Sequence, residues 1–208
     1  MQIIVLLTVL SLAPAILLMM TSFTRIIIVL ALLRQALGTQ QLPPNQILTG
    51  LALFMTFVIM GPTMQSVNDR ALQPYMNGKI SQTEALSEAQ QPLRDFMEKQ
   101  IIRSHNETDV DLFMHFSHQP YAQSFHDVGT MSLIPAFMLS ELKTAFLLGF
   151  RVYLPFVIID MVISSVLVSM GMMMLPPVLI SLPFKLLLFV LVDGWHLITG
   201  SLMVSFRM

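Results

Sequence analysis

The chain has 208 residues, of which 55% are hydrophobic and only 11% are charged, and its net charge is −1. A soluble domain carries about 25% charged residues, so this composition excludes a water-soluble globule. The balanced charge gives no bulk attraction to nucleic acid, and the absence of cysteine excludes disulfides and thiolate metal sites. We therefore predict an all-α polytopic membrane protein, built from helical hairpins with a small helical extra-cytoplasmic domain.

Apolar stretches near the length of a membrane span, about 20 residues, account for most of the chain. In chain order they cover residues 3–33, 47–64, 133–150, 152–175 and 178–206. We predict three segments: N-terminal hydrophobic helices over 1–65, a polar helical domain over 66–131, and C-terminal helical hairpins over 132–208. Leu175-Pro176-Pro177 leaves little room for a loop, so a tight hairpin is expected there.

The polar domain over 66–131 holds more than half of the charged side chains. Ser81 is followed three residues later by Glu84, a capping-box pattern that predicts the start of a helix. Pro92 is expected to open a second helix, because proline is favoured in a first helical turn. Leu93, Phe96, Met97 and Ile101 follow it at helical spacing.

The charge distribution also predicts an orientation. Acidic residues outnumber basic ones in the polar domain, whereas Arg34, Arg151 and Arg207 lie in or beside the hydrophobic segments. The positive-inside rule places these arginines on the cytoplasmic side and the acidic domain outside. A cleavable signal peptide is not expected, because the N-terminus lacks a basic region and a small-residue cleavage site.

Several ionisable residues interrupt the apolar stretches. They are Arg25, Glu141, Lys143, Asp160, Lys185 and Asp193. Each would cost about 2.5–3.5 kcal/mol at a lipid-facing helix centre, so they must face protein or water, or lie outside the hydrocarbon. Because both signs occur equally, we favour pairing between helices or subunits, with Glu141 and Lys185 as one pair. The alternative is an ion-coupled transporter or proton channel that uses Arg25, Asp160 and Asp193 as a relay.

Methionine is abundant, with 18 residues, and three of them stand together as Met172, Met173 and Met174. They follow Gly171 and precede the double proline, so they are expected at a hairpin tip. Flexible thioether side chains adapt to irregular neighbours. A ring of such tips could close a pore by a hydrophobic constriction, although an ordinary buried loop would explain the same pattern.

Catalytic and metal-binding patterns are weak. His115 and His118 have a spacing that zinc accepts, but their segment is typical of a solvated face. Nucleophile-elbow, phosphate-loop and dinucleotide motifs are absent from the sequence. We therefore expect no catalytic, cofactor-binding or metal-binding residues, and no enzyme activity.

Longer motifs in both halves of the chain resemble one protein family. In chain order they are TSFTRIIIVL at 21–30, LRQALGTQQ at 33–41, PPNQ at 43–46, GLALF at 50–54, SELKTAF at 140–146, IID at 158–160, GMMMLPP at 171–177, LPFKL at 182–186 and VDGW at 192–195. They resemble the FliP/SctR family of inner-membrane export-gate proteins of bacterial type III secretion systems. The VDGW ending and the sizeable polar domain are closer to the flagellar branch of that family.

The resemblance implies a pore-forming core subunit of the flagellar export gate, which passes unfolded flagellar proteins across the inner membrane at the basal body. It implies about five copies in a helical ring, with FliQ-like and FliR-like subunits, FlhB-like and FlhA-like export components, and much of the assembly on the periplasmic side. Met172, Met173 and Met174 would form a methionine gasket, and Glu141 would pair with Lys185 across subunits. Arg25, Asp160 and Asp193 would support assembly as buried charges. No cofactor is implied.

Overall fold

The computed structural model describes residues 7, 11, 14–39, 41–117, 125–172 and 174–207, and within these ranges every regular element is helical. In chain order the elements are α2 (Phe23–Leu37), α3 (Asn45–Val67), the π-helical turn η1 (Asn68–Leu72), α4 (Gln73–Met76), α5 (Gln82–Arg103), α6 (Thr108–Phe116), the 3-10 turn η2 (Phe125–Asp127), α7 (Thr130–Ser169), α8 (Pro177–Leu191) and α9 (Gly194–Ser205). The predicted all-α class is confirmed.

Two helical stretches in the described residues are long and apolar enough to cross a membrane, Asn45–Met76 and Thr130–Ser169. The bent pair α8 and α9, which meet at 64°, would make a third span if the two act as one. The apolar stretches on either side of Arg151 belong to one helix, α7, since arginine is a good helix former. These helices confirm the polytopic membrane prediction.

The described chain divides into two compact units. The first comprises residues 1–24 and 55–144 with Met208, and the second comprises 25–54 and 145–207, so that α3 and α7 contribute to both. These cuts fall at other positions than the three segments predicted from composition. The three-segment division stays a prediction about how the chain is organised.

In the first unit, α5 begins with the predicted capping box. The Ser81 hydroxyl accepts a hydrogen bond from the Glu84 amide at 3.3 Å, and the Glu84 carboxylate accepts one from the Ser81 amide at 2.7 Å. These bonds hold the pKa of Glu84 below its ordinary value, with the larger effect from the bond to the Ser81 backbone and the smaller from the bond to its side chain. The prediction of a helix start at Ser81 is confirmed.

The prediction that Pro92 opens a second helix is wrong, because α5 continues through it from Gln82 to Arg103. A proline inside a helix costs about 3 kcal/mol through the lost hydrogen bond and the ring clash. The turns that follow bury Phe96, Met97 and Ile101 almost completely. Burial of each such side chain contributes about 1.5–3 kcal/mol, which together exceeds the cost of the proline.

The start of α7 is tied to α5 by Arg94, which sequence reasoning did not single out. Its guanidinium donates to the Thr130 hydroxyl and to the Val128 carbonyl, both at 2.8 Å, and it lies 3.4 Å from the Glu98 carboxylate. The rings of Phe96 and Phe137 meet edge to face nearby in the same unit, with centroids 6.0 Å apart. Arg94 thereby satisfies the Val128 carbonyl, which lies just before α7.

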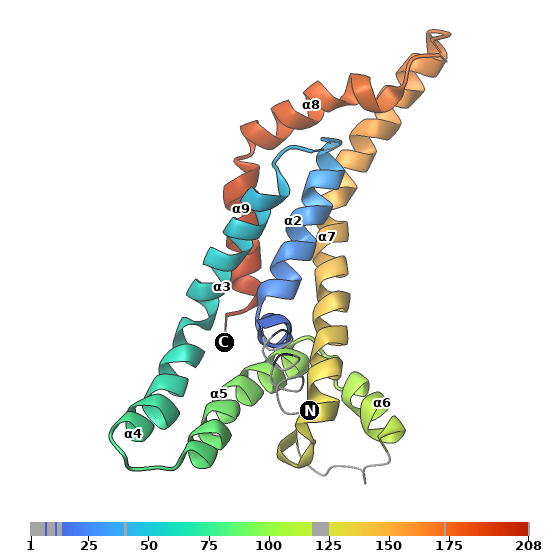
Figure 1. Ribbon diagram of the computed structural model, residues 1–208. Coiled ribbons are helices and arrows are strands. Elements are labelled where there is room, and N and C mark those ends of the chain that lie inside the picture. The colour runs from blue at the N-terminus through green and yellow to red at the C-terminus, as the bar shows by residue number, and fades with distance from the viewer. Residues whose placement is uncertain are drawn as a thin grey trace. The chain divides into compact units, whose positions relative to one another are not determined.

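In the second unit, α2 runs beside the middle of α7 (Figure 1). A side-chain carbon on Gly149 would lie 2.2 Å from Leu32, so the missing side chain lets the two helices approach closely. The bend between α8 and α9 is built in a similar way. Asp193 has a left-handed backbone, with φ of 50°, and Gly194 lies against the ring of Phe189, which also contacts Trp195 edge to face.

Candidate functional site

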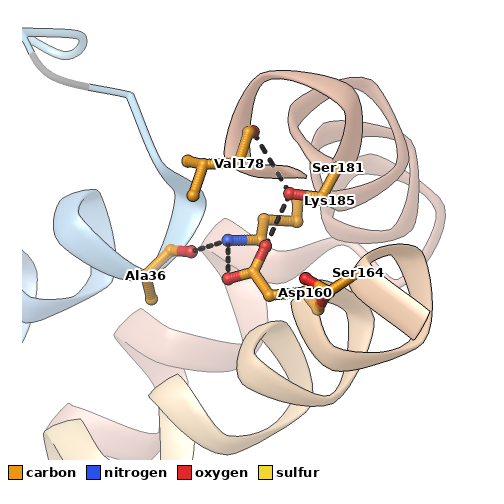
Figure 2. A network of polar contacts seen from close by, with 6 residues as sticks. All are labelled: Ala36, Asp160, Ser164, Val178, Ser181 and Lys185. Atoms are coloured by element: carbon orange, nitrogen blue, oxygen red, sulfur yellow. Dashed lines mark hydrogen bonds and ion pairs between the residues drawn. The ribbon is translucent and has the colours of Figure 1, made fainter. Parts of the chain in front are cut away.

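A charge network within the second unit joins α2, α7 and α8 around Lys185 (Figure 2). The Lys185 ammonium lies 2.6 Å from Asp160 Oδ2 and donates to the Ala36 carbonyl at 3.1 Å. The other carboxylate oxygen, Asp160 Oδ1, accepts from the Ser181 hydroxyl at 2.5 Å. The Lys185 side chain is only 4% exposed and that of Asp160 is 29% exposed. Burial of Lys185 is therefore compensated by a counter-charge and a carbonyl.

The sequence of α8 explains this position. Its buried residues Ser181, Lys185 and Phe189 recur every fourth position and so share one helix face. The same spacing brings Ser181 and Lys185 to opposite oxygens of one carboxylate. Ser181 was missed by sequence reasoning, although a serine four residues before a lysine in an apolar helix was a visible signal.

A second buried cation in this unit is Arg25. Its side chain is 1% exposed, and its Nη1 lies 3.1 Å from the Ser205 carbonyl and 3.2 Å from the Ser205 hydroxyl at the end of α9. Its guanidinium also lies 3.9 Å from the centre of the Phe206 ring. A cation at a helix C-terminus satisfies a carbonyl that the helix leaves open and complements the helix dipole.

Arg25 and Lys185 therefore do the same structural task in the second unit. Lys185 donates to Ala36 in the last turn of α2, as Arg25 donates to Ser205 in the last turn of α9. Asp193, the third residue of the alternative relay, is exposed at the bend between α8 and α9. Arg25, Asp160 and Asp193 thus have different surroundings, and the role of these three residues in assembly stays a prediction.

The other two charges of the apolar stretches lie on α7 in the first unit. Glu141 is completely buried, while Lys143, two residues along, is about half exposed and forms an ion pair with Asp109 of α6. The two side chains thus take different faces of α7, as residues two positions apart on a helix do. Within the chain Lys185 pairs with Asp160, and the pairing of Glu141 with Lys185 across subunits stays a prediction.

The methionine-rich segment follows a well-defined end of α7. Gly171 has φ of +73°, the Met172 amide bonds to the Leu167 carbonyl at 2.9 Å, and the Gly171 amide bonds to the Val168 carbonyl at 3.0 Å. This pair of bonds is the Schellman arrangement, which favours glycine at the left-handed residue. Met172 is 45% exposed and Met174 is 99% exposed, while Met173 lies outside the described residues. Met174 thus has almost no contact within the chain, and Met172 is only partly covered.

The weak possibility of a zinc site at His115 and His118 gains no geometric support in the part of the chain that is described. His115 lies in the last turn of α6 with its ring edge to face with that of Phe116, and His118 lies outside the described residues. Among the described residues no group of three potential ligands could hold a metal ion.

The apolar helices with buried, compensated charges define an all-helical, polytopic membrane protein. Comparison with known proteins narrows this class. Residues 6–202 match the FliP family. The chain is 55% identical over 205 residues to flagellar biosynthetic protein FliP of Bacillus subtilis (strain 168), covering 99% of this chain and 91% of the relative.

Two further relatives carry the same name. The protein of Pectobacterium carotovorum subsp. carotovorum is 55% identical over 205 residues, covering 99% of this chain and 78% of the relative. That of Aquifex aeolicus (strain VF5) is 48% identical over 208 residues, with 99% and 85% covered. The chain belongs to the FliP family.

Proposed function

We propose that this chain is a pore-forming core subunit of the flagellar type III export gate, passing unfolded flagellar proteins across the inner membrane. The observation that carries the proposal is the near-complete match to relatives named flagellar biosynthetic protein FliP. The protein acts without catalysis or cofactor. It works as about five copies with FliQ-like and FliR-like subunits, and contacts FlhB-like and FlhA-like components at the basal body, largely on the periplasmic side.

The surface of α7 supports a role inside an assembly. From residue 146 onward it exposes large apolar side chains, namely Phe146, Leu147, Phe150, Leu154, Ile158, Met161, Val162 and Val166. A contiguous apolar patch of this kind is rare on soluble monomers and marks contact with lipid or with other subunits. Neighbouring subunits around a ring would cover this face.

The exposed tip methionines support a gate. A pore must be closed to ions when no substrate is passing, and a hydrophobic constriction closes a pore by excluding water. Met172, Met173 and Met174 on several copies would form that constriction. The exposure of Met172 and Met174 is then a feature of the isolated chain, and the ring would bring the tips together.

The experiment compares export and leakage in cells that lack the native protein and carry a variant. The wild-type chain should restore swimming and secretion of flagellar proteins into the medium. Replacing Met172, Met173 and Met174 by alanine should raise the inward leak of ions. The matched control is Met131→Ala, at an exposed methionine in the first turn of α7, away from both the tip and the apolar face described above. An unchanged leak in the triple variant would contradict the gate.

The rival functions are separated by Asp160→Asn. A proton relay predicts an intact complex that no longer transports, whereas a structural role predicts a weakened complex. The contacts of Asp160 with Lys185 and Ser181 favour the structural role. A purely structural scaffold, the third possibility, predicts unchanged ion conductance both in this variant and in the tip variant.

A further inference from the structure

Two cavities in the second unit share the side chain of Arg34, and the function proposed above does not use either. The first has a volume of about 540 Å³ and lies between α2 and the first turn of α8. The second, of about 440 Å³, lies along the segment that joins α2 to α3. Volumes of this size are those of sites that bind small molecules.

The first cavity is apolar along one part and polar along another. Ile28, Leu32 and Val178 line its apolar part, and Arg34, Gln35 and Thr39 supply its polar groups. The second cavity adds the side-chain amides of Gln41, Asn45 and Gln46, which can donate hydrogen bonds. The lining thus combines a hydrocarbon-like surface with a group of hydrogen-bond donors.

The charge of Arg34 is not neutralised by the described lining. Among the described residues that line the two cavities, Arg34 is the one charged side chain. Its Nη1 donates to Asn45 Oδ1 at 2.5 Å and lies 3.4 Å from the Pro43 carbonyl, and both acceptors are neutral. These bonds fix the guanidinium while Nη2 and Nε can still donate. A planar cation held in this way suits a phosphate or carboxylate.

We propose that the Arg34 cavities bind an anionic phospholipid, with its phosphate on Arg34 and one acyl chain along Ile28, Leu32 and Val178. Three observations favour a lipid. The lining is amphipathic, the cation has no carboxylate partner in it, and Arg34 lies in the last turn of an apolar helix. Basic pockets between helices at the cytoplasmic side of a membrane bind anionic lipid head groups. The inference does not rest on the proposed export function.

The test measures lipid that stays with the protein when it is extracted in mild detergent with its co-expressed neighbours. Native mass spectrometry and lipid analysis count phosphatidylglycerol and phosphatidylcholine per chain after reconstitution with equal amounts of both. The wild-type protein should retain phosphatidylglycerol preferentially. Arg34→Gln keeps hydrogen-bonding groups but removes the charge, and should lower that retention about tenfold, the effect of losing one charge-assisted contact.

Three further variants make the result specific. Arg34→Lys should retain most of the lipid, and Arg151→Gln, at an exposed arginine of α7 outside both cavities, should retain all of it. Ala31→Phe fills the apolar part of the first cavity from an exposed position and should lower retention without changing any charge. Unfolding curves followed by Trp195 fluorescence confirm that each variant is folded.

Several outcomes would overturn the proposal. Equal loss in Arg34→Gln and Arg151→Gln would mean that lipid follows overall charge. Displacement of the lipid by excess inorganic phosphate would make this a site for free anions. A cysteine at Val178 that cross-links to a second copy in a lipid-free complex would make the cavity a protein contact. Absence of retained lipid in the wild-type protein would also refute it.

Discussion

Replacing Asp160 by asparagine should destabilise the second unit, because it leaves the buried Lys185 ammonium without its counter-charge. Breaking a buried ion pair by removing one partner costs about 3–5 kcal/mol. The Asp160 side chain is 29% exposed and that of Lys185 is 4% exposed, so water offsets part of the loss. We therefore expect about 3 kcal/mol, or roughly a hundredfold shift in the folding equilibrium.

Trp195 makes this measurement local. It is the only tryptophan of the chain, and its ring lies 5.3 Å from that of Phe189, which is four residues after Lys185 on α8. Unfolding in detergent micelles by added dodecyl sulfate, followed by Trp195 fluorescence, gives the free energy of unfolding. Asp193→Asn is the matched control, because Asp193 is exposed, and it should unfold as the wild-type chain does.

A double variant tests the reasoning itself. Asp160→Leu together with Lys185→Met removes both charges, so neither is left buried and unpaired, and its stability should return close to wild type. If the double variant is as unstable as Asp160→Asn, the loss does not come from an uncompensated charge. If Asp160→Asn unfolds within about 0.5 kcal/mol of wild type, the ion pair is not a stabilising contact.

Three further predictions concern single backbone or capping positions. Gly194→Ala should destabilise the second unit by about 1–3 kcal/mol, because the new side-chain carbon would lie 2.2 Å from the Phe189 ring. Gly200→Ala in the same helix is the control, because its new carbon would have no atom within 4 Å. The Trp195 unfolding assay measures both variants. His105→Gly should stabilise by about 1 kcal/mol, seen as a higher melting temperature, because His105 has φ of 53°. Folding lowers the pKa of Glu84. Its capping bond therefore stabilises the helix start at pH values above the unfolded pKa, and this stabilisation is lost as the pH falls through the folded pKa. Hydrogen exchange at the Ser81 amide should therefore show added opening at low pH in wild type but not in Glu84→Gln.

Local features of the fold could be predicted from the sequence because the groups that form them are close along the chain. The capping box joins Ser81 and Glu84, which are three positions apart, and it is present as predicted. Pro92 was misjudged because its effect depends on what the helix buries further along. The apolar contacts of Phe96 and Ile101 are tertiary, and they override the local preference for a break.

The charge network was only partly predictable for the same reason. The sequence indicated that the Lys185 ammonium needs a counter-charge or acceptor, since an isolated charge in an apolar helix is too costly. It could not say which carboxylate supplies it within the chain, because Asp160 lies 25 residues away and the second acceptor, Ala36, lies 149 residues away. Several acidic residues met the same sequence criterion. Only the packing of α2, α7 and α8 within the second unit distinguishes Asp160 from the others.

The length of α7 sets a limit on how much of it lipid can cover. Its 40 residues make a helix of about 60 Å at 1.5 Å per residue, while the hydrocarbon core of a bilayer is about 30 Å thick. Even a tilt of about 40°, at the upper end for membrane helices, leaves roughly 15 Å of its height outside the hydrocarbon. An apolar helix that is longer than the hydrocarbon core is thick cannot be surrounded by lipid along its whole length. Its excess length has to be covered by protein, and the first unit of the chain itself covers the N-terminal part of α7, where Leu133, Ala136 and Phe137 are fully buried.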